Sequence, residues 1–353
     1  MINNISFTHA KVRSLAFLAA LLFVPIQPAL ADGIALRPEV RQFVDDMVIR
    51  NQFNRDELTV LLSQAETRPE IIAAITKPAE AKPWFQYRQI FLNEARIRGG
   101  VEFWDKHADL LARAQTAYGV PPEIITAIIG VETGYGKRTG SYRVLDALST
   151  LGFDYPPRSK FFLGELENFL LMAREEKLDP LVPQGSYAGA MGMPQFMPSS
   201  FRRFAVDFDA DGSRDLWNNV ADVIGSVGYY FFANGWQPDQ PVASRAKVDG
   251  ENFKALLTGN MKPSASLSKL KENGVTIADT LPDDQPGALL EFQTENGPEY
   301  WVGLQNFYAI TRYNRSPLYA MAVYQLSQEI RALRNARRVS DNSVSLLTVN
   351  AKD

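Results

Sequence analysis

The stretch Ile124–Tyr135, IITAIIGVETGY, places a single carboxylate in an otherwise apolar helical segment. Glu132 follows apolar residues on more than one face of the predicted helix, which indicates burial. Burial disfavours the charged form, so the pKa of Glu132 should rise. A Glu with a pKa of roughly 6–7 can hold a proton at neutral pH and then donate it. From this segment alone two alternatives stay open: a buried Glu paired with an Arg or Lys, or a Glu at a helix end that faces water.

Residues 1–31 have the pattern of a secretory signal peptide. Lys11 and Arg13 precede the apolar run Leu15–Val24, and an A-x-A cleavage site ends at Ala31. The apolar run is too short to cross a bilayer as a helix. Cleavage would leave 322 residues, and because the chain contains no Cys, the mature protein can carry neither a lipid-modified Cys nor a disulfide. We therefore expect a soluble periplasmic protein.

Charge and composition exclude several classes of function. The chain has a net charge of −3, and the signal contains two basic and no acidic residues, so the mature charge would be about −5. This balance argues against a nucleic-acid-binding protein. The two histidines, His9 and His107, cannot form a zinc site or a His-based triad between them.

The spacing of apolar residues predicts a mainly helical chain of the α+β class, with a small α/β insertion. Strands are expected at Gly287–Phe292 and Tyr300–Tyr308, on either side of a turn at Glu295–Pro298. The predicted division is a signal peptide (1–31), an N-terminal helical region (32–108), a helical core (109–237), a small β-containing domain (238–310), a returning C-terminal helix (311–338) and a flexible tail (339–353).

Small residues and methionines alternate in Gly185–Ser200, GSYAGAMGMPQFMPSS. Small residues let a backbone approach something bulky, and Met and Phe side chains can line a cleft. Ser186 and Gln195 add neutral groups that suit hydroxyl and acetamido functions. A tight loop–helix junction is the alternative, and the presence of Glu132 in the same chain favours the cleft.

An acidic segment beginning at Asp207 resembles the start of an EF-hand loop. Oxygen ligands at loop positions 1, 3, 5 and 9, with Gly at position 6, are what Ca²⁺ needs. The twelfth residue is Asn218 rather than Glu, and a residue further along could close a longer loop. The candidate ligands are Asp207, Asp209, Asp211, Ser213, Asp215 and Asp222. An acidic solvated turn is the alternative; a bound Ca²⁺ would be structural, because these residues lie outside the proposed cleft.

Several blocks of the chain together resemble the membrane-bound lytic murein transglycosylase B family. The blocks are GVETGYG (130–136), LDALSTLGFDYPPR (145–158), FFLGELENFLLMAREE (161–176), GSYAGAMGMPQFMPSSF (185–201), LWNNVADVIGSVGYYF (216–231) and TRYNRSPLYAMAVYQL (311–326). The likeness extends from about residue 35 to 335. It implies a lysozyme-like helical core, cleavage of peptidoglycan glycan strands, a single EF-hand-like calcium site and no catalytic cofactor. Cell-wall synthesis or remodelling proteins are candidate partners of a monomeric enzyme.

The resemblance also assigns roles to residues. It makes Glu132 the catalytic acid/base and places the substrate-binding residues Tyr87, Arg158, Ser186, Gln195, Tyr230, Asn314 and Tyr319 along the cleft. Arg158 is expected near the muramyl peptide, although Pro157 stands where many members have a second Arg. Among the aromatic residues between 300 and 324, Tyr313 and Tyr319 are the expected functional pair, because aromatic rings present apolar faces to sugars.

Two other functions are compatible with the same fold. A lysozyme-type hydrolase ordinarily needs a second carboxylate across the cleft, and the local candidates Asp146, Asp154 and Glu165 lie in segments typical of scaffold. A non-catalytic wall-binding protein would not need a buried acid. We therefore expect a lytic transglycosylase that cleaves between N-acetylmuramic acid and N-acetylglucosamine without water and leaves 1,6-anhydromuramoyl ends.

Overall fold

The computed structural model describes residues 34–77 and 82–350, with side chains to residue 339. The predicted signal peptide lies outside the described residues. The α-helices are α1 (Pro38–Asn51), α2 (Arg55–Ser63), α3 (Pro69–Ile75), α4 (Trp84–Phe91), α5 (Glu94–Lys106), α6 (Ala108–Tyr118), α7 (Pro122–Thr133), α8 (Val144–Asp154), α9 (Ser159–Glu175), α10 (Pro198–Phe204), α11 (Val220–Ala233), α12 (Leu267–Glu272), α13 (Gln305–Tyr313) and α14 (Pro317–Asn350). The 3-10 helices are η1 (Ile34–Leu36), η2 (Pro156–Arg158) and η3 (Asn252–Leu256).

The strands form two antiparallel sheets. They are β1 (Tyr142–Arg143), β2 (Gln184–Gly185), β3 (Ala243–Val248), β4 (Ala265–Ser266), β5 (Val275–Ile277), β6 (Pro286–Thr294) and β7 (Gly297–Gly303). Strands β1 and β2 form a small pair, and the larger sheet has the order β4-β6-β7-β3-β5. The mainly helical class with a small α/β insertion, predicted from the sequence, is confirmed.

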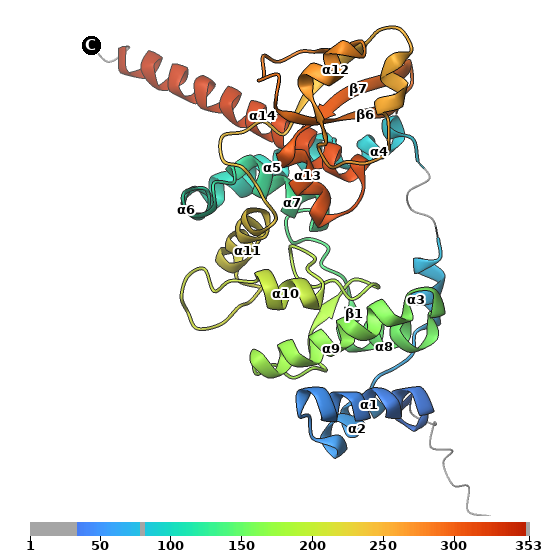
Figure 1. Ribbon diagram of the computed structural model, residues 1–353. Helices are drawn as coiled ribbons and strands as arrows, with labels where there is room; N and C mark the ends of the chain where they lie inside the picture. The colour runs from blue at the N-terminus through green and yellow to red at the C-terminus, as the bar shows by residue number, and fades with distance from the viewer. Residues whose placement is uncertain (1–33, 78–81, 351–353) are drawn as a thin grey trace, which may run out of the picture.

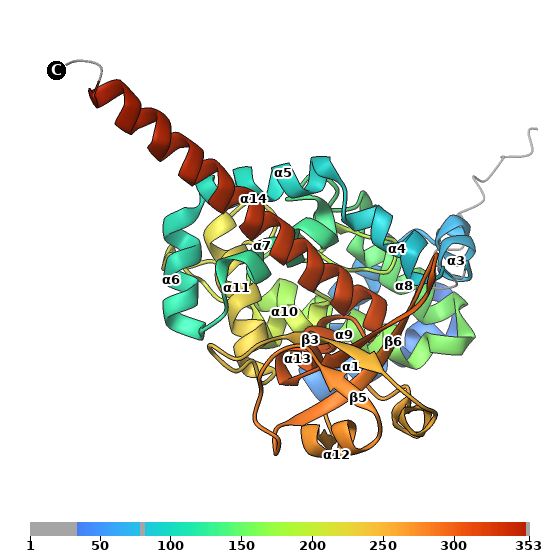
Figure 2. The same cartoon turned by 90° about the horizontal axis from the view of Figure 1, so that it is seen from above.

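Helix α7 is the central element of the molecule. Pro121 and Pro122 pre-set the dihedral angles of its first turn, and Gly134, at φ +60°, ends it in the left-handed conformation. Nearly every residue between these ends is buried, so this helix is covered around its whole circumference. Helices α5, α6 and α14 pack against it, and Figure 2 shows α14 crossing over it.

The molecule is elongated, with the two helices α1 and α2 at one end and the larger sheet at the other (Figure 1). Helices α8 and α9 lie between α1 and the centre. The sheet has a small apolar core of its own, formed by Phe253, Leu267, Leu270, Val275, Leu289, Val302 and Leu304. Helix α4 packs against both β6 and α14 and so joins the sheet to the helical part.

Two predictions about element boundaries are wrong. The strand predicted to reach Tyr308 ends at Gly303, and α13 begins at Gln305. Its buried residues Phe307 and Ile310 lie three positions apart, which is helical spacing, and the aromatic content of this segment had favoured a strand. The flexible tail predicted after residue 338 is instead helical to Asn350. Residues 339–350 contain neither Gly nor Pro to end the helix, and α14 extends beyond the other elements in Figure 1.

Across the described part of the chain, we find no helix that combines the length and apolarity needed to cross a bilayer.

Candidate active site

Glu132 lies in the last turn of α7 and stays partly exposed. The Tyr319 hydroxyl of α14 donates a hydrogen bond of 2.5 Å to its Oε1 atom. No ion pair of the described residues involves Glu132, so the alternative of a salt-bridged Glu is not realised. The other alternative is met in part, because the carboxyl group stands at a helix end and reaches solvent.

Burial raises the pKa of Glu132 to about 7. The hydrogen bond from Tyr319 and the positive charge of Arg96 act in the opposite direction and limit the rise. The position at the negative end of the α7 dipole also disfavours a carboxylate. At neutral pH both the protonated and the ionised forms of Glu132 are therefore populated, as the apolar sequence of α7 predicts.

Three tyrosine rings line up beside Glu132. The rings of Tyr313 and Tyr319 stack with centroids 6.4 Å apart, and the ring of Tyr230 lies 4.7 Å from that of Tyr313, tilted by 59°. The hydroxyl of Tyr313 donates to the carbonyl of Pro194, and that of Tyr230 donates to the carbonyl of Arg312 at 2.6 Å. Burial raises the pKa of Tyr313 and Tyr319 well above the ordinary value, so both stay neutral donors. The structure thus gives Tyr230, predicted to contact substrate, a buried position behind Tyr313.

Arg96 of α5 holds the end of α7 in place. Its guanidinium donates to the carbonyl of Gly130 and, at 3.2 Å, to that of Val131. Tyr135, which has a φ of +65°, donates its hydroxyl to the Arg96 carbonyl at 2.7 Å. The Arg96 guanidinium thus adds a second donor at the Gly130 carbonyl, which also accepts from the Gly134 N–H, and Tyr135 connects the turn after α7 to α5. Sequence reasoning missed Arg96 and Tyr135; the Gly-Tyr-Gly that follows Glu132 was the signal of an unusual turn.

The loop 185–197 places Ser186 and Gln195 on a folded-back segment. Met191 pairs with both Gly185 and Phe196 in isolated bridges. The Nε2 atom of Gln195 donates to the carbonyls of Thr139 (3.0 Å) and Gly192 (2.9 Å), so its amide oxygen is the atom left to accept a bond. The Ser186 hydroxyl oxygen accepts from the Ala190 N–H at 3.1 Å and keeps its own proton to donate.

The small residues of this loop serve close packing within the protein. A Cβ atom at Gly192 would lie 2.3 Å from the carbonyl oxygen of Leu216, and φ there is +68°. At this position the close neighbour that requires Gly is the protein's own backbone, as the alternative of a tight loop–helix junction predicts. The tight loop and the candidate binding residues coexist in the same segment.

The remaining predicted binding residues lie at different distances from Glu132. Tyr87 of α4 is partly buried, and its electrostatic interaction with Tyr319 contributes to the raised pKa of Tyr319. Asn314 is exposed at the end of α13, directly after Tyr313. Arg158 is exposed on η2, where its guanidinium lies 4.4 Å from the ring centroid of Phe161. No contact in the described residues joins Arg158 to the group around Glu132.

The carboxylates considered as second catalytic groups are engaged elsewhere. Asp146 is buried and accepts from the Arg143 side chain at 2.8 and 2.9 Å. Asp154 pairs with Arg37 at 2.7 Å. Glu165 accepts from the backbone and hydroxyl of Ser199 at 2.9 and 2.7 Å. Each has a structural partner, as their surrounding sequence suggested.

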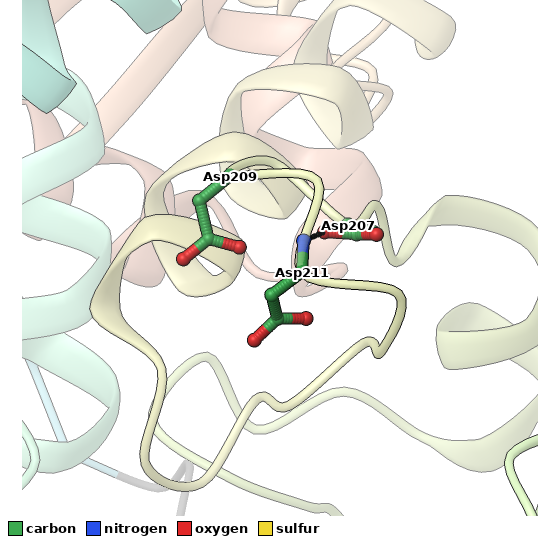
Figure 3. Close-up of side chains that lie close together, drawn as sticks. All are labelled: Asp207, Asp209 and Asp211. Atoms are coloured by element: carbon green, nitrogen blue, oxygen red, sulfur yellow. Dashed lines mark hydrogen bonds between the residues drawn. The ribbon is translucent and has the colours of Figure 1, made fainter.

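Three of the six predicted metal ligands come together. Oxygen atoms of Asp207, Asp209 and Asp211 lie within 4.8 Å of one another, from one turn of the loop (Figure 3). Two ligands of one Ca²⁺ are at most about 5 Å apart, so this spacing fits the ion. The Asp207 carboxylate also accepts from the backbone of Asp211 and Gly212, which folds the loop around it.

Asp215 and Asp222 stand outside this cluster. Asp222 is fully buried and accepts from the backbone N–H groups of Phe208 (2.7 Å) and Asp215 (2.8 Å), and burial raises its pKa. Asp215 accepts from the backbone of Trp217 and Asn218. Ser213 is exposed and donates its backbone N–H to Asp211. The loop is therefore closed by Asp222 through backbone hydrogen bonds.

Two cavities adjoin these regions. One of about 490 Å³, bordered by Leu178, Val182 and Trp217, lies against the outer side of the acidic loop and includes neither Glu132 nor Tyr319. The other, of about 280 Å³, is lined by Arg96 and by the residues that follow Glu132. The second cavity therefore adjoins the end of α7 and begins at Thr133, which directly follows Glu132 in the sequence.

A carboxyl group whose pKa is raised to about 7, held by a tyrosine hydroxyl at the end of a buried helix, can exchange a proton near neutral pH. Residues 35–328 match the family described as "Transglycosylase SLT domain", and the chain belongs to that family. Membrane-bound lytic murein transglycosylase B of Escherichia coli (strain K12) is 45% identical over 310 residues, which cover 85% of this chain and 84% of the relative.

Solved structures of lytic transglycosylases have the same fold. The catenated SltB1 of Pseudomonas aeruginosa is 53% identical with a TM-score of 0.82, covering 85% of this chain and 99% of that one. Escherichia coli Slt35, solved in complex with calcium, is 45% identical with a TM-score of 0.78, covering 85% and 95%. Pseudomonas aeruginosa SltB3, solved with NAG-anhNAM-pentapeptide, is 28% identical with a TM-score of 0.74, covering 83% and 79%. The chain is thus a peptidoglycan-cleaving lytic transglycosylase with a lysozyme-like helical core.

Proposed function

We propose that Glu132 acts first as acid and then as base in cleaving the β-1,4 bond between N-acetylmuramic acid and N-acetylglucosamine. The observation that carries this proposal is its pKa of about 7, with no carboxylate among the groups that shift it. A group near half-protonation at neutral pH can serve in both directions.

The reaction needs no water. Protonated Glu132 donates its proton to the glycosidic oxygen as the bond from that oxygen to C1 of the muramoyl sugar breaks. The sugar's own 2-acetamido oxygen stabilises the positive charge at C1, as in substrate-assisted glycosidases. The ionised Glu132 then removes the proton of the 6-hydroxyl, whose oxygen bonds to C1. The product carries a 1,6-anhydro ring, and Glu132 is protonated again.

The surrounding residues orient the sugars and the acid. Ser186 offers a hydroxyl proton and Gln195 an amide oxygen, which suit acetamido and hydroxyl groups of the glycan. Tyr319 holds Glu132 by a hydrogen bond, and Tyr313 supports Tyr319 by stacking. We place Tyr87 and Asn314 on the sugar path, Tyr230 behind it, and Arg158 near the peptide side chains.

We further propose a structural Ca²⁺ held by Asp207, Asp209 and Asp211. The spacing of their oxygens fits the ion, and the related Slt35 was solved with calcium. The metal has no catalytic part, because this loop contains none of the residues placed around Glu132.

The place of action follows from the first residues of the sequence. We propose that residues 1–31 direct export and are removed, and that the mature enzyme acts as a soluble monomer on peptidoglycan strands with their peptides in the periplasm. Cell-wall synthesis or remodelling proteins are the partners to test. Residues 109–237 with 311–338 form the catalytic unit of this proposal, and 32–108 and 238–310 flank it.

The mass of the new ends tests the reaction. Purified peptidoglycan strands are digested with the enzyme, and the muramoyl fragments are weighed. We expect 1,6-anhydro ends, 18 mass units lighter than hydrolysed ends because no water is added. Ends that carry the mass of water would replace this proposal with the lysozyme-type alternative, and intact strands would favour a binding scaffold.

The variant Glu132→Gln tests the proposed role of Glu132 in proton transfer. It keeps the shape of the side chain but cannot exchange the proton, so turnover should fall by at least about 1000-fold while glycan binding is retained. Binding measured by co-sedimentation with insoluble peptidoglycan provides the control for folding. A variant that still cleaves at a tenth of the normal rate would contradict the role of Glu132.

A further inference from the structure

Three cationic side chains share the cavity that adjoins the end of α7. The cavity of about 280 Å³ is lined by Ile90, Asn93, Ala95, Arg96, Thr133, Gly134, Tyr135, Lys137 and Arg138. Thr133 directly follows Glu132, so the cavity begins one residue beyond the proton donor. We call it the basic cavity. No Asp or Glu is among its lining residues.

Within the described residues, no ion pair involves any of the three cations of the basic cavity. Lys137 and Arg138 are exposed and form no ion pair within the described residues, and Arg96 directs its guanidinium to backbone carbonyls. On the same helix as Arg96, Glu94 is paired with Arg98. Burial lowers the pKa of Arg96 most, and repulsion from Arg138 lowers it further, whereas attraction to Tyr135 and Glu132 acts in the opposite direction. A chain with net charge −3 has thus gathered three like charges where an anion would relieve their repulsion.

The basic cavity also lies beside the path proposed for the glycan. Tyr87 and Ile90 are three residues apart on α4, so they occupy the same face of that helix. Tyr87 interacts with Tyr319, the partner of Glu132, whereas Ile90 borders the basic cavity. Along α4, therefore, about one helical turn separates the residue that interacts with Tyr319 from the residue that borders the basic cavity.

The volume of the cavity limits its occupant. At about 280 Å³ it falls at the lower end of small-molecule sites, which suits one or two amino-acid residues better than a disaccharide. Guanidinium groups bind carboxylates in a two-point geometry, and an ammonium group adds a point charge. In peptidoglycan the groups that carry carboxylates are the peptides attached to the muramoyl sugar.

We propose that the basic cavity binds a carboxylate of the muramoyl peptide through Lys137 and Arg138, with Arg96 positioned behind them. This inference rests on the proposed function, since it requires the muramoyl sugar to lie at Glu132. It adds a point of peptide recognition on the α4–α7 side of the site, apart from the one proposed at Arg158 on η2. A bound peptide would thereby fix the muramoyl sugar relative to the proton donor and select peptide-bearing strands for cleavage.

The double variant Lys137→Gln/Arg138→Gln tests the proposal, because both side chains are exposed and the fold does not use them. It is assayed on peptide-bearing glycan strands and on the same strands freed of peptide by an N-acetylmuramoyl-L-alanine amidase. We expect kcat/KM to fall about tenfold on the peptide-bearing strands and to change less than about twofold on the stripped strands. The selective loss should shrink at high salt.

A matched control removes the same charge elsewhere. Arg41→Gln/Lys262→Gln neutralises two exposed cations that are remote from the site, and it should behave like the wild type on both substrates. An equal loss on both substrates, or no loss on either, would overturn the proposal. The mass of the products distinguishes the failure of this proposal from the failure of the proposed reaction. Anhydro ends without peptide selectivity would contradict peptide binding in the basic cavity alone. Ends with added water would contradict the proposed reaction.

Discussion

Glu132 makes the free energy of unfolding fall as pH rises, whereas acidic side chains with a lowered pKa make it rise. Its pKa is raised to about 7 in the folded protein, from an ordinary value of 4.5. The folded state therefore binds the proton more tightly than the unfolded state. As pH rises from 4.5 to 7, ionisation of Glu132 lowers the free energy of unfolding by a growing amount. Above pH 7 the full cost is present, up to about 3 kcal/mol at 1.4 kcal/mol per pKa unit.

The variant Glu132→Gln should remove that cost. We expect it to raise the free energy of unfolding by up to about 3 kcal/mol at pH 8 and to leave it nearly unchanged at pH 4.5. Urea unfolding of the two proteins at both pH values measures the difference. A variant that is equally destabilised at both pH values would show that the Glu132 carboxylate is not strained in the folded protein.

We expect the hydroxyl of Tyr319 to influence the pH range in which the enzyme is active. Its hydrogen bond favours the ionised form of Glu132 and lowers its pKa, so Tyr319→Phe should raise that pKa above 7. Since the first step needs protonated Glu132, activity declines as pH rises through this pKa, and the decline should move to higher pH in the variant. The pH profile of kcat/KM checks this, with Tyr308→Phe as a control outside the tyrosine stack. An unchanged profile would separate Tyr319 from proton transfer.

At the scale of elements, the loop 185–197 depends on a backbone that few residues can adopt. Gly192 has a φ of +68°, and a Cβ there would lie 2.3 Å from the Leu216 oxygen. We expect Gly192→Ala to cost about 2 kcal/mol or more and to lower activity, because Gln195 bonds to the same residue.

Substitution of Gly164, in the middle of α9, should have the opposite effect on stability. Nothing lies within 4 Å of a Cβ built there, so Gly164→Ala should stabilise the protein by about 0.5–1 kcal/mol through helix propensity. Chemical denaturation should give a lower free energy of unfolding for Gly192→Ala and a higher one for Gly164→Ala than for the wild type. If both substitutions were equally tolerated, the close approach of Gly192 to Leu216 would not be a constraint.

The acidic loop should make stability respond to calcium. A ligand that binds only the folded state adds about 2.7 kcal/mol at a concentration 100 times Kd. We expect Ca²⁺ to raise the Tm of the wild type and of Asp284→Asn, whose substitution lies far from the loop, but not that of Asp211→Asn. Equal melting temperatures in calcium and in chelator would eliminate the site.

The sequence predicted some elements of this site better than others, for physical reasons. The apolar run of α7 determined both the helix and the raised pKa of Glu132, because burial follows from local composition. The aromatic segment after Tyr300 was predicted to be a strand throughout. Aromatic side chains occur in strands and in helices alike, and only tertiary packing selects the helix α13. Arg96 and the basic cavity were invisible, since they arise from α5 and α7 meeting in space. Asp222 had the right type and spacing for a ligand, yet its burial commits it to backbone donors.

On the scale of the whole molecule, Trp84 joins the sheet to the helical part. Its Nε1 atom donates to Glu299 of β7 at 3.1 Å, and its ring lies 5.5 Å from Phe292 of β6. Because α4 also carries Tyr87, Trp84→Ala should destabilise the protein by about 3–5 kcal/mol and raise KM. Trp84→Phe should cost less, by keeping the ring contact, and the exposed Val60→Ala should change stability by less than about 0.5 kcal/mol. Urea unfolding and kinetics measure these effects, and an unchanged KM in Trp84→Ala would uncouple the sheet from the site.

The hydrogen bond between Tyr319 and Glu132 spans 187 residues of sequence. A ribosome therefore releases the acid long before it releases the residue that restrains it, and a nascent chain holds Glu132 without its stacked tyrosines. The acid is restrained only once α14 has docked over α7. We therefore expect a fragment that ends before residue 317 to lack the restrained acid, even where α7 itself is folded.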